Sequence, residues 1–206
     1  MVIAGAGSHA MEVLDVLISK KMNVGVKFFD NVSSENVFQS SYPVLKSKDE
    51  LTDAFKMDPR FMLGVGECEV REFMYKLFVS LGGELVGIRT ESAIISTYSP
   101  SDTSDVFHHS FIGANVELGL GTLINTGSFI HHGATVGRFS TISPGVQVLG
   151  NACVGDLSFI GAGAILLPGV KVGNNVKVAA GAVVTVDVPD EATCIGVPAK
   201  IKSVIK

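Results

Sequence analysis

The stretch SFIHHGATVGRFSTISPGVQVLGNACVGDLSFIGAGAILLPGVKV, residues 128–172, places an aliphatic residue at every sixth position, and the same spacing extends from Val106 to Pro189. The aliphatic positions are Ile112, Leu118, Ile124, Ile130, Val136, Ile142, Val148, Val154, Ile160, Leu166, Val172, Val178 and Val184. The residue two positions before each is small or β-branched, so every repeat has two inward positions separated by one outward position. Such a repeat is a very short strand followed by a turn, and it predicts a parallel β-helix.

Three repeats are expected to make one triangular coil of roughly 18 residues, and each strand then stacks on the strand one coil earlier at about 4.8 Å. The period itself does not give the handedness of the coil. The general rule for parallel crossovers would favour a right-handed turn.

The start of the chain has a different pattern. A short strand, residues 1–4, is followed by Gly5-Ala6-Gly7-Ser8-His9-Ala10, a helical pattern over residues 11–18, and a strand that ends at Asp30-Asn31. This order is typical of the first half of a Rossmann-type nucleotide site. Ala10 stands at the expected third glycine, so the motif alone leaves a plain connecting turn as an equal alternative.

If the turn binds a nucleotide, Gly7, Ser8 and His9 face the pyrophosphate at the helix N-terminus. Asp30 and Asn31 are then placed to contact the ribose or the base. An NAD-type oxidoreductase would use the same geometry but would not need the long β-helix.

Three segments are expected along the chain. Residues 1–90 alternate strands with helices, including a strand that ends at Gly66-Glu67, and predict a small α/β domain. Residues 91–105 are rich in Ser, Thr, Asp and Pro and are interpreted as a junction. Residues 106–206 form the β-helix and a C-terminal tail.

The composition excludes several classes. The net charge is −4, which gives nucleic acid no electrostatic attraction. There is no apolar run of membrane-spanning length and no basic region before an apolar start, so we expect a cytoplasmic protein with no membrane insertion. Cys68, Cys153 and Cys194 lack disulfide or zinc spacing, and no metal site is expected.

With these motifs established, the chain resembles the bacterial nucleotide-aminosugar N-acetyltransferases of the hexapeptide-repeat family, which are related to the sialic-acid O-acetyltransferases. The residues that carry the resemblance are Gly5-Ala6-Gly7-Ser8-His9, Asp30-Asn31, Gly66-Glu67, Asn125-Thr126-Gly127, Ile130-His131-His132 and Gly196-Val197-Pro198-Ala199-Lys200. The resemblance implies that the β-helix is left-handed and that the N-terminal domain holds a nucleotide sugar, with Gly66 among its binding residues. It also implies a homotrimer with acetyl-CoA between neighbouring subunits.

The resemblance places the catalytic base at His132. A neutral imidazole suits the removal of a proton from an attacking amine or hydroxyl. This chain departs from the family pattern, because the neighbours of His132 are His131 and Gly133 rather than a carboxylate. His131 is a rival base, although successive turn residues point in different directions.

The resemblance also places Thr141, Gly150, Ala162 and Ala180 along a groove for acetyl-CoA. Thr141 stands where some relatives have a second histidine. Gly150 comes one coil after His132, so its N–H is a candidate donor to the oxyanion. Lys200 is a candidate partner for the CoA phosphates, with an exposed tail charge as the alternative.

Three functions remain open at this stage. The first is transfer of acetyl to the amine of a nucleotide-linked 4-amino-4,6-dideoxy sugar for surface glycan synthesis, by direct attack with His132 as base. The second is O-acetylation of a sialic acid or a related sugar. The third is a catalytically idle scaffold that binds nucleotide sugar. The nucleotide and the sugar stereochemistry are not determined.

Overall fold

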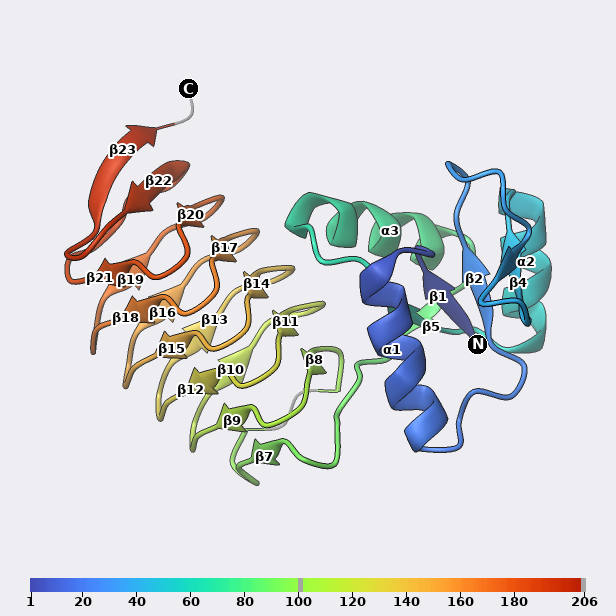
Figure 1. Cartoon of the computed structure of the whole chain (residues 1–206), viewed down its shortest axis with the longest axis horizontal. Helices are drawn as coiled ribbons and strands as arrows, with labels where there is room; N and C mark the ends of the chain where they lie inside the picture. The colour runs from blue at the N-terminus through green and yellow to red at the C-terminus, as the bar shows by residue number, and fades with distance from the viewer. Residues whose placement is uncertain (100–101, 205–206) are drawn as a thin grey trace. The chain divides into compact units, whose positions relative to one another are not determined.

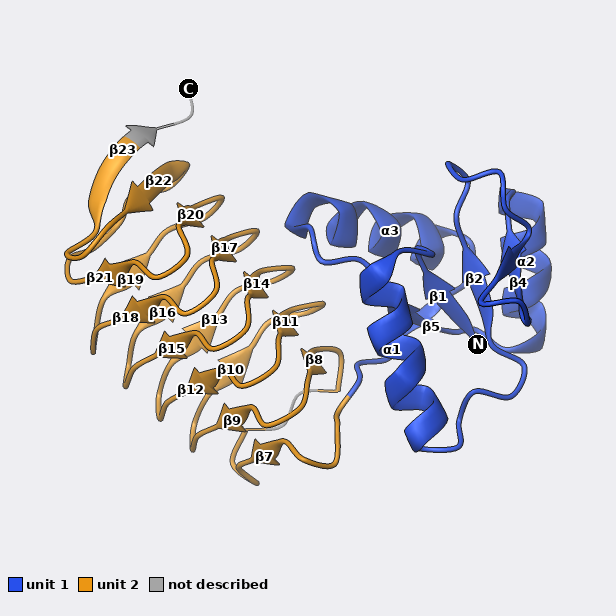
Figure 2. Ribbon diagram, viewed as in Figure 1, with its two compact units in different colours: residues 1–88 blue, residues 89–206 orange. Residues whose placement is uncertain are grey.

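A computed structural model describes residues 1–99 and 102–204 of the chain. It divides into two compact units, Met1–Ile88 and Arg89–Lys206 (Figure 2). The first contains the helices, and the second is a stack of short strands (Figure 1).

The first unit is a small α/β domain. Its elements are β1 (Val2–Ala4), α1 (Ser8–Ser19), β2 (Lys27–Phe29), β3 (Val37–Phe38), β4 (Tyr42–Leu45), α2 (Lys48–Met57), β5 (Arg60–Leu63), α3 (Cys68–Ser80) and β6 (Glu84–Leu85). The strand order is β3-β4-β2-β1-β5-β6. All pairs are parallel except the edge pair β3·β4, which is antiparallel. The expected Rossmann-like domain is therefore present, with one antiparallel strand at its edge.

Helices cover this sheet on both faces. Along the sheet, the step from β1 to β2 and the step from β5 to β6 go in opposite directions. Because both crossovers are right-handed, α1 and α3, which make these connections, lie on opposite faces of the sheet. Phe78 of α3 packs on Phe55 of α2, with ring centroids 5.5 Å apart, and so α2 shares the face of α3. On the α1 side, Gly64 allows close packing, because a Cβ at this position would lie 2.8 Å from Ala10 Cβ.

The second unit is a parallel β-helix with three faces. Face 1 is β8-β11-β14-β17-β20-β22-β23, face 2 is β7-β9-β12-β15-β18-β21 and face 3 is β10-β13-β16-β19. The strands are β7 (Ile94–Ile95), β8 (Asp105–Val106), β9 (Phe111–Ile112), β10 (Glu117–Leu118), β11 (Leu123–Ile124), β12 (Phe129–Ile130), β13 (Thr135–Val136), β14 (Thr141–Ile142), β15 (Gln147–Val148), β16 (Cys153–Val154), β17 (Phe159–Ile160), β18 (Ile165–Leu166), β19 (Lys171–Val172), β20 (Lys177–Val178), β21 (Val183–Val184), β22 (Ala192–Ile195) and β23 (Lys200–Val204).

The register confirms the 18-residue coil. Phe129 pairs with Gln147 and Ile130 with Val148, and the same offset recurs along each face. The aliphatic column and the small column predicted from the repeat both point inward and form one buried core. Buried hydroxyls in the small column bridge adjacent coils, as where Ser128 Oγ donates to Ser143 O at 2.9 Å. Polar side chains are thus tolerated inside because each is hydrogen-bonded.

The segment that was expected as a junction, residues 91–105, contains a strand of the β-helix. β7 lies within that segment and pairs in parallel with β9, and Arg89 bridges to Val106. This part of the chain therefore belongs to the second unit. Ala93 and Ile95 pack against the β-helix core, but Ile95 pairs with Ile112, which is 17 residues further on, so this coil is out of register with the six-residue series by one residue.

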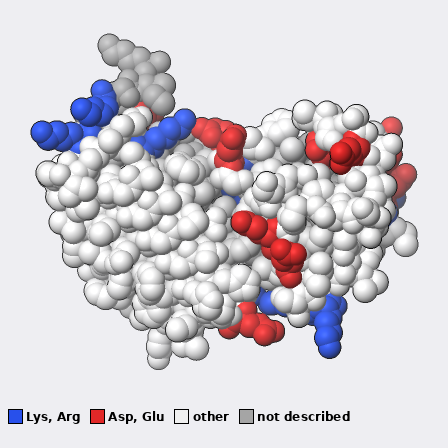
Figure 3. All heavy atoms as spheres, in the orientation of Figure 1, with Lys and Arg blue, Asp and Glu red and all other residues white. Residues whose placement is uncertain are grey.

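At the other end, β23 turns back and pairs antiparallel with β22. Basic side chains gather at this end of the β-helix, beside the C-terminus (Figure 3). Within residues 1–99 and 102–204, no helix has both the length and the apolar character needed to cross a membrane.

Candidate functional site

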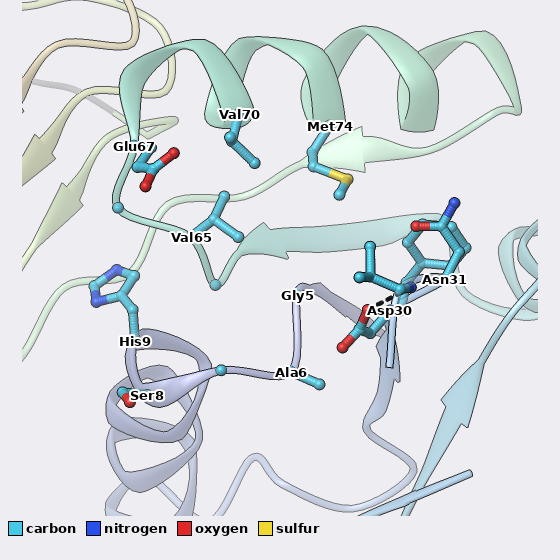
Figure 4. A pocket seen from close by; sticks show the side chains of 15 residues that line it. Gly5, Ala6, Ser8, His9, Asp30, Asn31, Val65, Glu67, Val70 and Met74 are labelled. Atoms are coloured by element: carbon cyan, nitrogen blue, oxygen red, sulfur yellow. Dashed lines mark hydrogen bonds between the residues drawn. The ribbon is translucent and has the colours of Figure 1, made fainter. Parts of the chain in front are cut away.

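The first unit contains a pocket of about 370 Å³ (Figure 4). Its walls include every residue that the sequence placed on the nucleotide side, namely Gly7, Ser8, His9, Asp30, Asn31 and Gly66. Figure 4 shows His9 and Glu67 at one end of the pocket and Asp30 and Asn31 at the other. The structure therefore brings three separate segments of the chain to one cavity.

The position of this pocket follows from the sheet topology. β1 has β2 on one side and β5 on the other. The order in which successive strands are added to the sheet therefore reverses at β1, although all three strands are parallel. The pocket residues directly follow the carboxyl ends of β1, β2 and β5. This crevice is where doubly wound α/β sheets bind their ligands.

Two helix N-termini reach the pocket without side-chain caps. The N-cap residues are Gly7 for α1 and Glu67 for α3, and neither has a side-chain capping bond. By contrast α2, whose N-terminus does not line this pocket, has a complete capping box from Ser47 and Glu50. Uncapped N-terminal N–H groups and the positive end of the helix dipole favour an anion.

Two glycines leave room for that anion. A Cβ at Gly7 or at Gly66 would meet no atom within 4 Å. Gly5, in contrast, has φ +96° and would place a Cβ 2.7 Å from Val65, so it is required by the turn itself.

The polar side chains at the two ends are held by local bonds. Asp30 Oδ1 accepts the N–H groups of Val32 at 2.8 Å and Ser33 at 3.2 Å, which fixes the turn after β2. These bonds engage only one of its two carboxylate oxygens. His9 Nδ1 contacts Glu12 Oε2 at 2.8 Å, which orients the imidazole at the other end.

This pocket also has an apolar wall, which no sequence motif indicated. Val70 and Met74 of α3 line it. Their spacing of four residues puts them on one side of α3, and this side faces the cavity in Figure 4. A second pocket, which shares Phe29 and Asn31 with the first, was also missed.

In the second unit, His132 lies at the corner between face 2 and face 3. Its imidazole packs on Gly150 in the next coil, where a Cβ would come 2.7 Å from Cε1 and 2.8 Å from Nε2. The expected neighbourhood of His132 and Gly150 is therefore present. The N–H of Gly150 donates to no described residue, so it remains available beside the ring.

His131 points to the opposite side. Its ring lies 6.0 Å from that of Phe111, one coil earlier, whereas His132 lies against the following coil. Neither imidazole has a hydrogen-bond partner in the described part of the chain, so no carboxylate of the described chain orients His132.

The residues expected along the acetyl-CoA groove are not together within one chain. Thr141 lies in β14 on face 1 and is only 4% exposed. Ala162 and Ala180 are exposed at the corner between faces 1 and 2, whereas Gly150 lies at the corner between faces 2 and 3. Like Gly150, both alanines have backbone N–H groups with no described acceptor.

Lys200 is exposed in β23, the last strand of the second unit. No cluster of three or more His, Cys, Asp or Glu side chains that could hold a metal occurs in residues 1–99 and 102–204.

Comparisons with known proteins agree with this arrangement. Residues 1–78 match the PglD N-terminal domain family, and residues 154–185 match the bacterial transferase hexapeptide family, which comprises six repeats. No curated protein sequence matches the chain.

Solved structures match over nearly the whole chain. PerB from Caulobacter crescentus, in complex with CoA and GDP-perosamine, is 29% identical with a TM-score of 0.90, covering 98% of this chain and 96% of that one. The acetyltransferase domain of PglB from Neisseria gonorrhoeae, in complex with acetyl coenzyme A, is 27% identical with a TM-score of 0.89, covering 98% of each chain. WeeI from Acinetobacter baumannii, at 21% identity and a TM-score of 0.68, shares the fold.

The chain thus combines a small Rossmann-like domain with a left-handed hexapeptide-repeat β-helix, and this confirms the expected fold class. The resemblance to the bacterial nucleotide-aminosugar N-acetyltransferases of the hexapeptide-repeat class is likewise confirmed.

Proposed function

We propose that this chain transfers the acetyl group of acetyl-CoA to the amine of a nucleotide-linked 4-amino-4,6-dideoxy sugar. The observation that carries the proposal is the pairing of two sites in one chain: an anion-binding pocket at a sheet switch point, and an exposed imidazole beside an unused backbone N–H. PerB, which the chain resembles over nearly its whole length, binds CoA and GDP-perosamine together.

The first unit holds the nucleotide diphosphate. The two uncapped helix N-termini bind the phosphates, and Gly7 and Gly66 admit them because neither carries a side chain. The carboxylate oxygen of Asp30 that the turn does not use accepts a ribose hydroxyl. Asn31, at the same end, supplies a further donor and acceptor.

His132 acts as the general base. Its ring accepts a proton from the sugar amine as the amine nitrogen attacks the thioester carbonyl. The N–H of Gly150 stabilises the resulting oxyanion, which then collapses, expels the CoA thiolate and leaves the amide. Transfer is direct, because no cysteine or serine nucleophile is needed between the two substrates.

Acetyl-CoA binds against exposed backbone at Ala162 and Ala180, with Lys200 near its phosphates and Thr141 near its acetyl end. Because His132 and the two alanines lie at different corners of one β-helix, the proposal includes a homotrimer in which the corners of neighbouring copies meet. We place the reaction in the cytoplasm, where acetyl-CoA is made, and in the synthesis of surface glycans.

The test is a thiol-release assay with acetyl-CoA and GDP-, UDP- and dTDP-linked 4-amino-4,6-dideoxy sugars, with His132→Ala alongside. Turnover of one amino sugar that is lost in His132→Ala supports the proposal. Turnover only with a hydroxyl acceptor favours O-acetylation of a sialic acid or related sugar. Binding of both substrates without any turnover favours an idle scaffold.

A further inference from the structure

A second cavity of about 370 Å³ adjoins the first in the α/β unit, and its chemistry differs. It is lined by Phe29, Asn31, Lys46, Lys48, Phe73, Lys76 and Leu77, and we call it the lysine pocket. Phe29 and Asn31 line both cavities, so the lysine pocket continues from the Asp30 and Asn31 end of the first pocket.

An aromatic platform is exposed in this pocket. Phe73 of α3 is 61% exposed although it is large and apolar. Phe29 and Leu77 add apolar surface to the walls. A nucleobase can stack flat on such a ring, whereas a phosphate has no apolar face that could do so.

Three lysines surround the platform and differ in their local partners. Lys46 Nζ donates to Ser33 O at 2.7 Å, and Lys76 pairs with Glu72 at 2.9 Å. Lys48, at the first turn of α2, has no ion pair in the described part of the chain. Each ammonium is a donor with no acceptor capacity, so the pocket rim favours carbonyl oxygens.

We propose that the lysine pocket binds the base of the nucleotide sugar and selects a base that presents carbonyl acceptors. Guanine, uracil and thymine present a carbonyl oxygen at the edge away from the ribose, whereas adenine and cytosine present an amino group there. This inference rests on the proposed function and fixes the direction of the substrate. The base lies on Phe73, the ribose at Asp30 and the diphosphate at the helix N-termini, so the sugar leaves the first pocket at the His9 and Glu67 end.

The experiment measures binding of GDP, UDP, ADP, CDP and inorganic pyrophosphate to the full chain by calorimetry. The variants are Phe73→Ala and Lys48→Gln, with Val79→Ala as the matched control, because Val79 is an exposed α3 residue that lines neither pocket. GDP or UDP is expected to bind at least about 10-fold more tightly than ADP and CDP. Phe73→Ala is expected to weaken that binding by about 5- to 100-fold through lost stacking, and to leave pyrophosphate binding unchanged.

The outcomes separate this inference from the proposed function. Nucleoside diphosphates that bind equally well with all four bases, or that bind Phe73→Ala as well as the wild type, overturn the base site and leave the proposed function standing. No binding of any nucleoside diphosphate overturns both. Weaker GDP and UDP binding in Lys48→Gln with unchanged ADP binding supports the role of the lysines.

Discussion

The imidazole of His132 lies against the Cα of Gly150, the residue one coil further on, so closely that a methyl group on Gly150 would come within 2.7 Å of Cε1. In the absence of an adjacent carboxylate, this packing is what limits where the ring can lie. On the preceding coil, a Cβ at Gly113 would likewise come 2.8 Å from His132 N, so the backbone at His132 is also closely packed.

Gly150→Ala should therefore displace the catalytic ring. We expect kcat to fall by about 100-fold, toward the loss seen when a general base is removed, with little change in the KM for the nucleotide sugar. Steady-state kinetics in the background of His132→Ala give the decisive comparison. If Gly150 acts through His132, the second substitution adds little, whereas additive losses would mean that Gly150 has an independent role.

A matched control separates this effect from the cost of crowding. Gly155 is also crowded, since its Cβ would meet Gly173 at 2.6 Å, but it lies at another corner of the β-helix, away from His132. Gly155→Ala should lower Tm, and the folded fraction should retain wild-type kcat. A similar loss of kcat in both variants would show that general distortion, not the position of the ring, explains Gly150→Ala.

The two adjacent histidines should differ sharply. His132→Ala is expected to reduce kcat by about 10²- to 10⁴-fold. His131→Ala should have a small effect, because its ring lies beside Phe111 rather than Gly150. Rate measurements at saturating acetyl-CoA test this, and the reverse ranking would assign the base to His131.

Asp30 has a structural and a binding role that can be separated. Asp30→Asn keeps an Oδ1 acceptor for the N–H groups of Val32 and Ser33 but loses the charge, whereas Asp30→Ala loses both. We expect a raised KM for the nucleotide sugar in both variants and lower thermal stability only in Asp30→Ala. Unchanged substrate KM in Asp30→Asn would show that the carboxylate serves the turn alone.

Substitution of Gly64 and of Gly66 by alanine should affect different properties: the first should lower stability, and the second should weaken ligand binding. A Cβ at Gly64 would lie 2.6 Å from Ile3 Cγ2 and 2.9 Å from Ala4 O, so Gly64→Ala should cost about 1–3 kcal/mol in unfolding free energy. Gly66→Ala meets nothing within 4 Å and should unfold as the wild type does while binding nucleoside diphosphate more weakly. Denaturant melts with calorimetric binding check both, and equal destabilisation would contradict the difference in packing.

Acid should weaken the interaction between Asp58 and Arg60 in the α/β unit. The hydrogen bonds from Arg60 hold the pKa of Asp58 well below its usual range, and the terminal ammonium adds to this shift. A lowered pKa means that the contribution to stability is present above about pH 4, the ordinary carboxyl range, and is lost as the pH falls below it. The stability difference between wild type and Asp58→Asn should thus begin to shrink below about pH 5 and keep shrinking well below about pH 3, because the folded-state pKa lies far below the ordinary carboxyl value. Urea melts across this range measure it, and a constant difference would contradict the prediction.

The sequence by itself determined the repeat and its consequences. An aliphatic residue at every sixth position can be buried only in short strands with a turn between them, so the β-helix, its inward columns and the neighbourhood of His132 and Gly150 followed from spacing alone. The glycine turn and Asp30 likewise predicted one side of the pocket, because the carboxyl ends of adjacent parallel strands meet at one edge.

The tertiary structure decided which surfaces these residues share. Helical spacing places Val70 and Met74 on one apolar face of their helix, but it does not tell burial against a sheet from the lining of a cavity, because both require such a face. Thr141 is nine residues from His132, which is half a coil, and so lies on a different face. The lysine pocket gathers residues of β2, α2 and α3 and of the turns that follow β2 and β4. Only the packing of these elements brings them together, because no local pattern links residues so far apart in the chain.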